Sequence, residues 1–243
     1  MSRGREPFGR GSSYVATTVT GLEERLAAEL RLLGGTEVSP IVRAVHFRAD
    51  LETLYSILLR SRLAMRLLRQ LARYTADDRR QLYEKCRRLP WSRLIPPGKS
   101  FAIRPQSNSA RFKNAKFASQ VVKDAIVDAQ RDAGGRRSSV NPRSPDLQLQ
   151  LRIEGREVEL LLDAAPEPLS RRGYRRSGGA APINEVLAAG LLDIAGWDGS
   201  GPLLDPFCGS GTILAEAAIK RNRIAPNGSR RSWCHPHWLD FDA

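Results

Sequence analysis

The chain has 243 residues, of which 41% are hydrophobic and 27% are charged, a composition typical of folded globular proteins rather than disordered ones. It has no run of about 18 apolar residues, so the sequence predicts no transmembrane helix, and its first residues lack the apolar region of a secretory signal. Three widely spaced cysteines argue against a disulfide framework and favour a reducing, cytoplasmic location.

The charge is strongly basic, with 39 Lys and Arg against 26 Asp and Glu and a net charge of +13. Residues 60–93 hold eleven basic and three acidic residues, and residues 99–137 hold nine and three. The rest of the chain is close to neutral, so an anion-binding surface is predicted within the first 140 residues. Such a balance favours nucleic acid over membrane as the partner, although a solvated arginine-rich face would give the same count.

The first predicted module follows a tail at residues 1–12 that is rich in Gly, Ser and Arg. A strand over Tyr14–Val19, a leucine-rich helix, a strand around Val45–Phe47 and a helix capped by Asp50 come next. Residues 64–74 either extend that helix or form another strand. The order β-α-β-α-β predicts a small ferredoxin-like α/β module over residues 13–75.

A second module is predicted over residues 76–164. It begins with a helix at 77–88, followed by a short strand that ends at Pro105 and a long helix at 110–133. Apolar residues then alternate along Leu147–Ile153 and again along Val158–Leu162, on either side of a Glu-Gly turn. This pattern predicts a β-hairpin.

The last part of the chain, residues 165–243, begins with a loop that joins it to the modules before it. A helix over 182–195 precedes a short buried strand at 202–205, a glycine turn and a helix over 212–220. An apolar strand, an acid at its carboxyl end, a glycine turn and a helix start are the parts of a ligand-binding loop in open α/β sheets.

That loop is the candidate cofactor site. Glycines let a backbone approach a ligand closely, the helix N-terminus offers unpaired N–H groups to an anion, and the acid can meet a positive group. S-adenosylmethionine has both a carboxylate and an ammonium, whereas a phosphate-binding loop would need a lysine after its last glycine. A plain tight turn would also contain these glycines. The candidate cofactor-binding residues are Asp205, Pro206, Phe207, Cys208, Gly209, Ser210, Gly211 and Thr212.

The motif Asp205-Pro-Phe-Cys-Gly-Ser-Gly-Thr-Ile-Leu-Ala-Glu-Ala-Ala218 resembles the first cofactor motif of class I methyltransferases related to N2-guanine RNA methylases. The segments Arg171-Arg-Gly-Tyr-Arg175 and Ala181-Pro-Ile-Asn-Glu-Val-Leu-Ala-Ala189 resemble the stretch that leads into it. Upstream, Thr18-Val-Thr-Gly-Leu-Glu-Glu24 and Val122-Lys-Asp-Ala-Ile-Val-Asp128 are similar to bacterial 23S rRNA (guanine-N2)-methyltransferases, as are Val45-His-Phe47 and Ser61-Arg-Leu-Ala64. The likeness runs in family order from about Tyr14 onward.

The resemblance implies a ferredoxin-like domain, a THUMP domain that binds RNA, and the first part of a Rossmann-like methyltransferase domain that uses S-adenosylmethionine. It implies structured RNA, 23S rRNA above all, as the partner. The family's Asn-Pro-Pro-Tyr loop, which holds the target base, does not occur here, so no catalytic residue is assigned. Asp240 and Asp242 are not assigned to the cofactor ribose. The chain is expected to stop some 40 residues into its catalytic domain.

Basic residues around the predicted long helix are candidates for contacts with RNA phosphates. They are Arg104, Arg111, Lys113, Lys116 and Lys123. Phe112 or Phe117 could stack a base, but phenylalanine at helical spacing is more often core, and we expect Phe117 to be buried. Further along, Arg171, Arg172 and Arg175 either contact RNA or solvate a linker.

Two further hypotheses concern the roles of cysteine and histidine residues. Cys234-His-Pro-His237 has metal-ligand residue types, but structural zinc needs four ligands, and only Cys208 is near in sequence, so no metal is expected. For Cys208 itself, a small buried thiol is the ordinary expectation, because no histidine lies near enough to activate it.

Three hypotheses follow for the function. The first is the RNA-binding and partial cofactor-binding portion of an RNA methyltransferase that modifies an exocyclic guanine amine. The second is a stand-alone RNA-binding THUMP module without catalytic activity. The third, a DNA methylase, shares the cofactor loop, but the resemblance of the first 160 residues argues against it.

Overall fold

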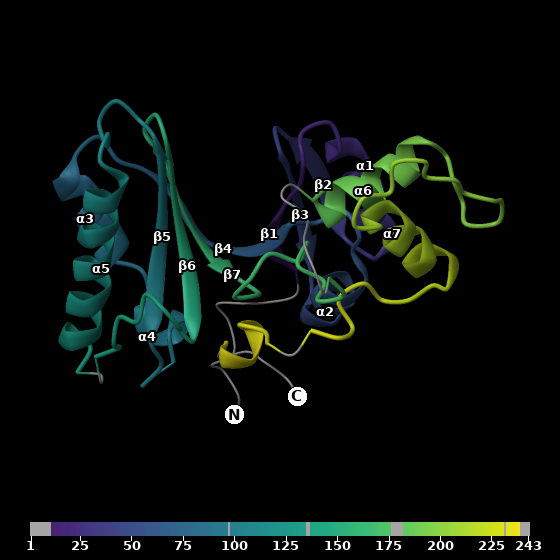
Figure 1. Ribbon diagram of the computed structural model, residues 1–243. Helices are drawn as coiled ribbons and strands as arrows, with labels where there is room; N and C mark the ends of the chain where they lie inside the picture. Colours follow the sequence, from purple (N-terminus) through teal and green to yellow (C-terminus); the bar gives the residue numbers. More distant parts are fainter. Residues whose placement is uncertain (1–10, 97, 135–136, 176–181, 231, 239–243) are drawn as a thin grey trace. The chain divides into compact units, whose positions relative to one another are not determined.

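The computed structural model describes residues 11–96, 98–134, 137–175, 182–230 and 232–238 (Figure 1). Most of the predicted tail at 1–12, together with Asp240 and Asp242, lies outside the described residues. The chain forms two compact units. We call residues 11–67 and 167–232 the first unit, and residues 68–166 and 233–238 the second unit.

The first unit contains strands that pair in the antiparallel order β2-β3-β1. These are β1 (Ser12–Thr17), β2 (Thr36–Ile41) and β3 (Ala44–Ala49), with helices α1 (Glu23–Leu32) and α2 (Leu51–Arg60). The predicted cap of α2 is confirmed, since Asp50 accepts a hydrogen bond from the Thr53 N–H at 2.8 Å. Strand β2 was not predicted from the sequence. It is largely exposed and contains Pro40, so its residues show no apolar alternation.

The second unit contains a sheet in the order β4-β7-β6-β5. Strand β4 (Arg66–Thr75) confirms the strand alternative for residues 64–74, and β6 (Leu147–Glu154) with β7 (Glu157–Asp163) confirms the predicted hairpin. Strand β5 (Phe101–Asn108) pairs parallel to β6 and continues past Pro105, where the sequence predicted its end. An edge position explains this, because a proline there loses no ladder hydrogen bond.

Helices cover this second sheet. Helix α3 (Arg79–Arg87) and the short α4 (Trp91–Leu94) pack on α5 (Ala115–Asp132), which contacts β5. Figure 1 shows α3 and α5 side by side next to β5. Trp91 is buried and donates its indole N–H to the Cys86 carbonyl at 2.7 Å. A short 3-10 helix, η1 (His235–His237), also belongs to this unit.

The first unit also contains α6 (Glu185–Ile194) and α7 (Thr212–Arg221), which contact each other. Asn184 caps α6 by accepting from the Val186 N–H at 2.9 Å. The helix packs closely on Leu22, since a Cβ added at Gly190 would lie 2.5 Å from the Leu22 Cδ1 atom. Arg25 of α1 forms an ion pair with Asp193 of α6 at 2.7 Å. The fold is of the mixed α/β class, as predicted.

The buried strand predicted at 202–205 is wrong. These residues lie outside any strand, and Leu204 is 87% exposed. A strand needs a neighbour for its hydrogen bonds, and no described residue between 167 and 232 lies in a strand. Within this segment, the apolar pattern therefore has no neighbouring strand to pair with.

Candidate cofactor loop and nucleic-acid interface

The glycine loop forms a tight turn directly before α7. The Gly211 N–H donates to the Cys208 carbonyl at 2.7 Å, and Gly209 and Gly211 have φ values of +52° and +72°. Only glycine adopts this left-handed region without strain. Gly211 is also the N-cap of α7, and no side chain caps the helix. The first N–H groups of α7 are thus left for water or a ligand.

The other residues of the loop have few contacts. The Asp205 carboxylate accepts a hydrogen bond from the Phe207 N–H at 3.2 Å, and the hydroxyls of Ser210 and Thr212 lie 3.2 Å apart. Phe207 is 92% exposed, and Cys208 is exposed as well. The expectation of a buried Cys208 thiol is therefore wrong, because the turn leaves its side chain at the surface.

These features fit part of an amino-acid ligand such as the methionine end of S-adenosylmethionine. An uncapped helix N-terminus suits a carboxylate, and the Asp205 carboxylate, which accepts from the Phe207 N–H, suits an ammonium. A Cβ added at Gly211 would meet nothing within 4 Å, so the backbone there is open to a ligand. The structure thus contains the helix that follows such a loop, but residues 202–205 before the loop do not form a strand.

A buried ion-pair network lies directly behind the loop helix. Glu216 of α7 is fully buried, and its Oε1 lies 2.7 Å from Nε of Arg172, whose side chain is also fully buried. Arg62 Nη2 lies 3.6 Å from the other carboxylate oxygen, and the Tyr174 hydroxyl donates to Oε1 at 3.1 Å. Burial raises the pKa of Glu216, and the two guanidinium groups oppose that shift.

This network corrects the prediction that Arg172 contacts RNA. Besides its ion pair, the Arg172 guanidinium donates to the Arg62 carbonyl at 2.6 Å. Its contacts therefore tie the segment before the loop to α7 and to the stretch between α2 and β4. A salt-bridged, fully buried guanidinium has no surface for a phosphate.

Arg175 is also engaged inside the unit. Its guanidinium lies 3.1 Å from the Glu185 carboxylate and donates to the Ile183 carbonyl at 2.9 Å and to the Thr212 hydroxyl at 3.3 Å. It thereby joins the start of α6 to the start of α7. Arg171, in contrast, is exposed and pairs with Glu167 at 3.1 Å.

The basic candidates of the second unit lie at its surface. Arg104, Lys113 and Lys116 are exposed, and in the described part of the chain no ion pair involves them. Arg111 pairs with Asp77 at 3.4 Å, and Lys123 pairs with its neighbour Asp124 at 2.7 Å.

The expectation that Phe117 is buried is wrong. Phe112 is buried, at 7% exposure, whereas Phe117 is 44% exposed. Phe117 lies in the first turn of α5, where its N–H donates to the Asn114 cap at 2.9 Å. Its side chain faces outward because the apolar face of α5 begins at Ala118 and continues through Val121 and Val122.

The Cys-His-Pro-His segment contacts charged groups of its own unit. His237 Nδ1 lies 3.1 Å from Lys99 Nζ, and its Nε2 lies 4.0 Å from the Asp146 carboxylate. Among the described residues, no three His, Cys, Asp or Glu side chains gather as metal ligands would. Within the same residues, no helix has both the length and the apolar character that crossing a membrane requires.

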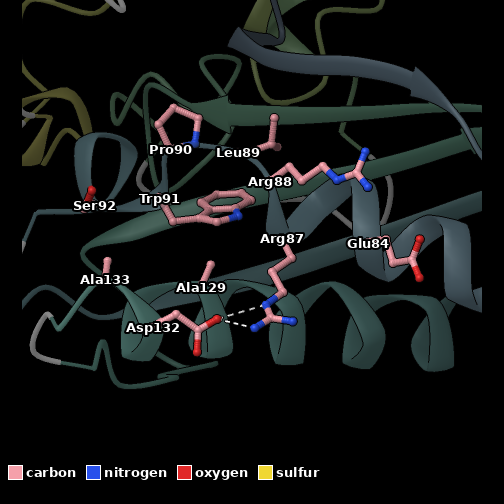
Figure 2. A pocket seen from close by; sticks show the side chains of 10 residues that line it. All are labelled: Glu84, Arg87, Arg88, Leu89, Pro90, Trp91, Ser92, Ala129, Asp132 and Ala133. Carbon is pink, nitrogen blue, oxygen red and sulfur yellow. Dashed lines mark hydrogen bonds and ion pairs between the residues drawn. The ribbon is translucent and has the colours of Figure 1, made fainter.

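The second unit also has a pocket of about 560 Å³ beside α3, α4 and α5 (Figure 2). Arg87 and Asp132, which line it, are joined by an ion pair, with the Arg87 Nε donating to Asp132 at 3.1 Å. Its other lining residues are Glu84, Arg88, Leu89, Pro90, Trp91, Ser92, Ala129 and Ala133. No sequence pattern indicates this pocket, because its walls come from three separate helices.

Comparison with known proteins finds three family models along the chain. An RlmL ferredoxin-like domain matches residues 13–68, a THUMP domain matches 76–163, and an RMKL-like methyltransferase domain matches 172–240. The ribosomal RNA large subunit methyltransferase K/L of Cellvibrio japonicus is 40% identical over 93% of this chain, which covers 31% of that relative.

Two crystal structures are similar over nearly the whole chain. A predicted N6-adenine-specific DNA methylase from Listeria monocytogenes has a TM-score of 0.86 and 30% identity, covering 98% of this chain and 63% of that one. The putative methyltransferase SMU.472, complexed with SAH, has a TM-score of 0.86 and 26% identity, covering 96% and 61%. The chain thus spans less than two thirds of the length of each of these proteins. It combines an RlmL ferredoxin-like domain, a THUMP domain and RMKL-like methyltransferase sequence, as the resemblance predicted.

Proposed function

We propose that this chain is the rRNA-binding portion of an S-adenosylmethionine-dependent RNA methyltransferase. The observation that carries the proposal is that one chain combines two matches. The THUMP match at 76–163 contains the exposed cations, and the methyltransferase match at 172–240 contains the glycine loop. The ferredoxin-like domain would be residues 13–75, and the RNA-binding domain would be residues 76–164. Part of the methyltransferase domain would follow at 165–243. The RNA would be 23S rRNA, and the acceptor the exocyclic N2 amine of a guanine.

The cofactor would be held by the loop from Asp205 to Thr212. The uncapped start of α7 would take the carboxylate of the methionine part, and Asp205 would take the ammonium. The cofactor supplies an electrophilic methyl group on its sulfonium. Arg175 keeps Thr212 beside α6 through its hydrogen bond of 3.3 Å, so it maintains the position of the loop.

The basic residues of the second unit would hold the RNA. Exposed cations contact phosphates and fix the register of a nucleic acid without reading its sequence. A guanine amine is a poor nucleophile, so methyl transfer to it depends on how well the amine is positioned. Holding the RNA in a fixed geometry would therefore be the main contribution of these basic residues. The target base would have to leave its stack to reach a methyl group.

Two specific observations support other functions. The exposure of Leu204 and Phe207 around the glycine loop favours a stand-alone RNA-binding module. The name of the Listeria structure, a predicted DNA methylase, favours DNA as substrate. Of the two nucleic acids, the THUMP match supports RNA.

The test measures binding of the full chain to a 23S rRNA fragment and to duplex DNA over a salt series. We expect RNA binding that weakens linearly with salt on a double-logarithmic plot, and weaker DNA binding. No salt-dependent RNA binding would overturn the proposal. A preference for duplex DNA would support the DNA methylase instead.

A second titration examines the cofactor loop by calorimetry with S-adenosylmethionine and with SAH. Saturable heat that disappears in Asp205→Ala supports the methyltransferase portion. Glu84→Ala, on the exposed surface of α3, is the matched control and should bind as the unmodified chain does. No heat with either ligand would contradict cofactor binding and favour a stand-alone RNA-binding function for this chain.

A further inference from the structure

One end of the second unit gathers basic residues from separate elements. Asp77, just before α3, pairs with Arg111 at 3.4 Å and with Arg156, from the β6–β7 turn, at 2.7 Å. At the first residue of α3, the Arg79 guanidinium lies 5.5 Å from the centre of the Phe117 ring. These contacts bring the starts of α3 and α5 together with the β6–β7 turn. We call this surface the basic end; it comprises Arg79, Arg111, Lys113, Lys116, Phe117 and Arg156.

The charge of the basic end is only partly balanced. Arg111 and Arg156 share the single carboxylate of Asp77. Arg79, Lys113 and Lys116 have no ion pair within the described ranges. Exposed cations that are not neutralised by the protein itself attract an anionic partner.

Phe117 is the feature that a purely electrostatic surface does not need. Phe117 is 44% exposed, on a helix whose other large apolar side chains are buried. The Arg79 guanidinium lies over the ring, so an aromatic ring and a guanidinium group are next to each other at the surface. Bases stack on both kinds of plane, and unpaired nucleotides can offer their faces to them.

We propose that Phe117 and Arg79 form a stacking platform for an unpaired base of RNA, with Lys113 and Lys116 contacting the flanking phosphates. This inference rests on the proposed function, since it names the RNA feature that the second unit would recognise. A base-paired helix keeps its bases stacked inside and would meet only the lysines. The platform therefore selects single-stranded loops, bulges or ends over continuous duplex.

Replacing the side chain of Phe117 should leave the fold intact. Its contribution to helix capping comes from the backbone N–H, which Asn114 accepts at 2.9 Å and which any residue but proline retains. Phe117→Ala thus removes the ring and leaves the start of α5 unchanged. Val140→Ala is the matched control, because Val140 is 42% exposed in the same unit and lies outside the basic end.

The experiment uses the full chain and a single-stranded RNA oligonucleotide that contains 2-aminopurine, whose fluorescence reports stacking. For Phe117→Ala we expect about 5- to 100-fold weaker binding and loss of the fluorescence change. Phe117→Trp should restore both, and Val140→Ala should change neither. Lys116→Ala should instead lower the slope of binding against salt by about 1, whereas Phe117→Ala should leave that slope unchanged.

The outcomes separate this inference from the proposed function. If the unmodified chain binds RNA and Phe117→Ala binds equally well, the platform is wrong and the proposed function stands. Equal affinity for a continuous RNA duplex, with no effect of Phe117→Ala, would also overturn the platform. If the unmodified chain binds no RNA but binds an acidic peptide through Phe117, both are wrong and the basic end is a protein interface.

Discussion

The cations of the basic end and those of residues 171–175 differ in what balances their charge. At the basic end, Arg79, Lys113 and Lys116 face solvent without an acidic partner among the residues described. In the first unit, Arg172 is enclosed with Glu216, and Arg175 is held by Glu185. Basic side chains are thus solvated at the surface in one region and part of the internal structure in the other.

Burial explains the difference. A charge removed from water needs a partner of opposite sign, and losing that partner is costly, whereas an exposed charge is solvated by water. Carboxylates therefore have opposite effects in the two regions. Glu216 is needed to keep a buried arginine, while Asp77 restrains two arginines that could otherwise bind an anion.

The largest expected effect is at Glu216. Glu216→Gln keeps the size of the side chain but leaves the Arg172 charge buried without its counter-charge. We expect the free energy of unfolding to fall by about 3–5 kcal/mol, measured by urea denaturation.

The control for Glu216→Gln is Glu84→Gln, which breaks the exposed pair between Arg80 and Glu84 and should leave the unfolding curve unchanged. The double variant Arg172→Leu with Glu216→Leu should recover part of the lost stability, because it removes the buried Arg172 charge together with Glu216 and leaves the Arg62 guanidinium without this partner. If Glu216→Gln unfolds like Glu84→Gln, the first unit does not depend on internal ion pairing and the comparison fails.

The next effect concerns how tightly the first unit holds its helices. Gly190→Ala places a Cβ 2.5 Å from Leu22 Cδ1, so α6 must shift or Leu22 must change rotamer. We expect a loss of about 1–3 kcal/mol in the free energy of unfolding. Gly201→Ala, where an added Cβ meets nothing within 4 Å, serves as the control.

A recovery experiment completes this test. Leu22→Ala removes the atoms that the new methyl group would meet, so combining it with Gly190→Ala should cost less than the sum of the two single changes. Strict additivity would show that α6 has room against Leu22 and that the close contact does not limit packing.

The sequence predicted the elements with strong periodicity and missed those held by non-local contacts. The hairpin of β6 and β7 and the helix capped by Asp50 have local signals, namely alternation and an acid at the N-cap. Strand β2 has no such signal, because its pairing with β3 rather than its own side chains makes it a strand. The predicted strand at 202–205 shows the converse, since apolar residues without a sheet partner do not form one.

Side-chain roles were harder to predict than elements. The turn at Gly209 and Gly211 was predicted from glycine spacing, and both residues have positive φ. The burial of Arg172 could not be predicted, because Glu216 lies 44 residues further along the chain and only the folded unit brings them together. Phe117 was misplaced because helical spacing alone does not say which face of α5 meets the sheet.

The smallest expected change in stability, and the sharpest contrast with Glu216, is at Asp77. Asp77→Asn removes the carboxylate that Arg111 and Arg156 share, and all three side chains are partly exposed. The free energy of unfolding should change by no more than about 1 kcal/mol, because water solvates the freed guanidinium groups. RNA affinity should rise several-fold, and the slope of binding against salt should steepen, since two more cations become available to phosphates.

Asp124→Asn, which frees Lys123 away from the basic end, is the control and should alter RNA affinity less. A stability loss as large as that of Glu216→Gln, with no gain in affinity, would mean that Asp77 is a structural carboxylate and that the two regions do not differ in kind.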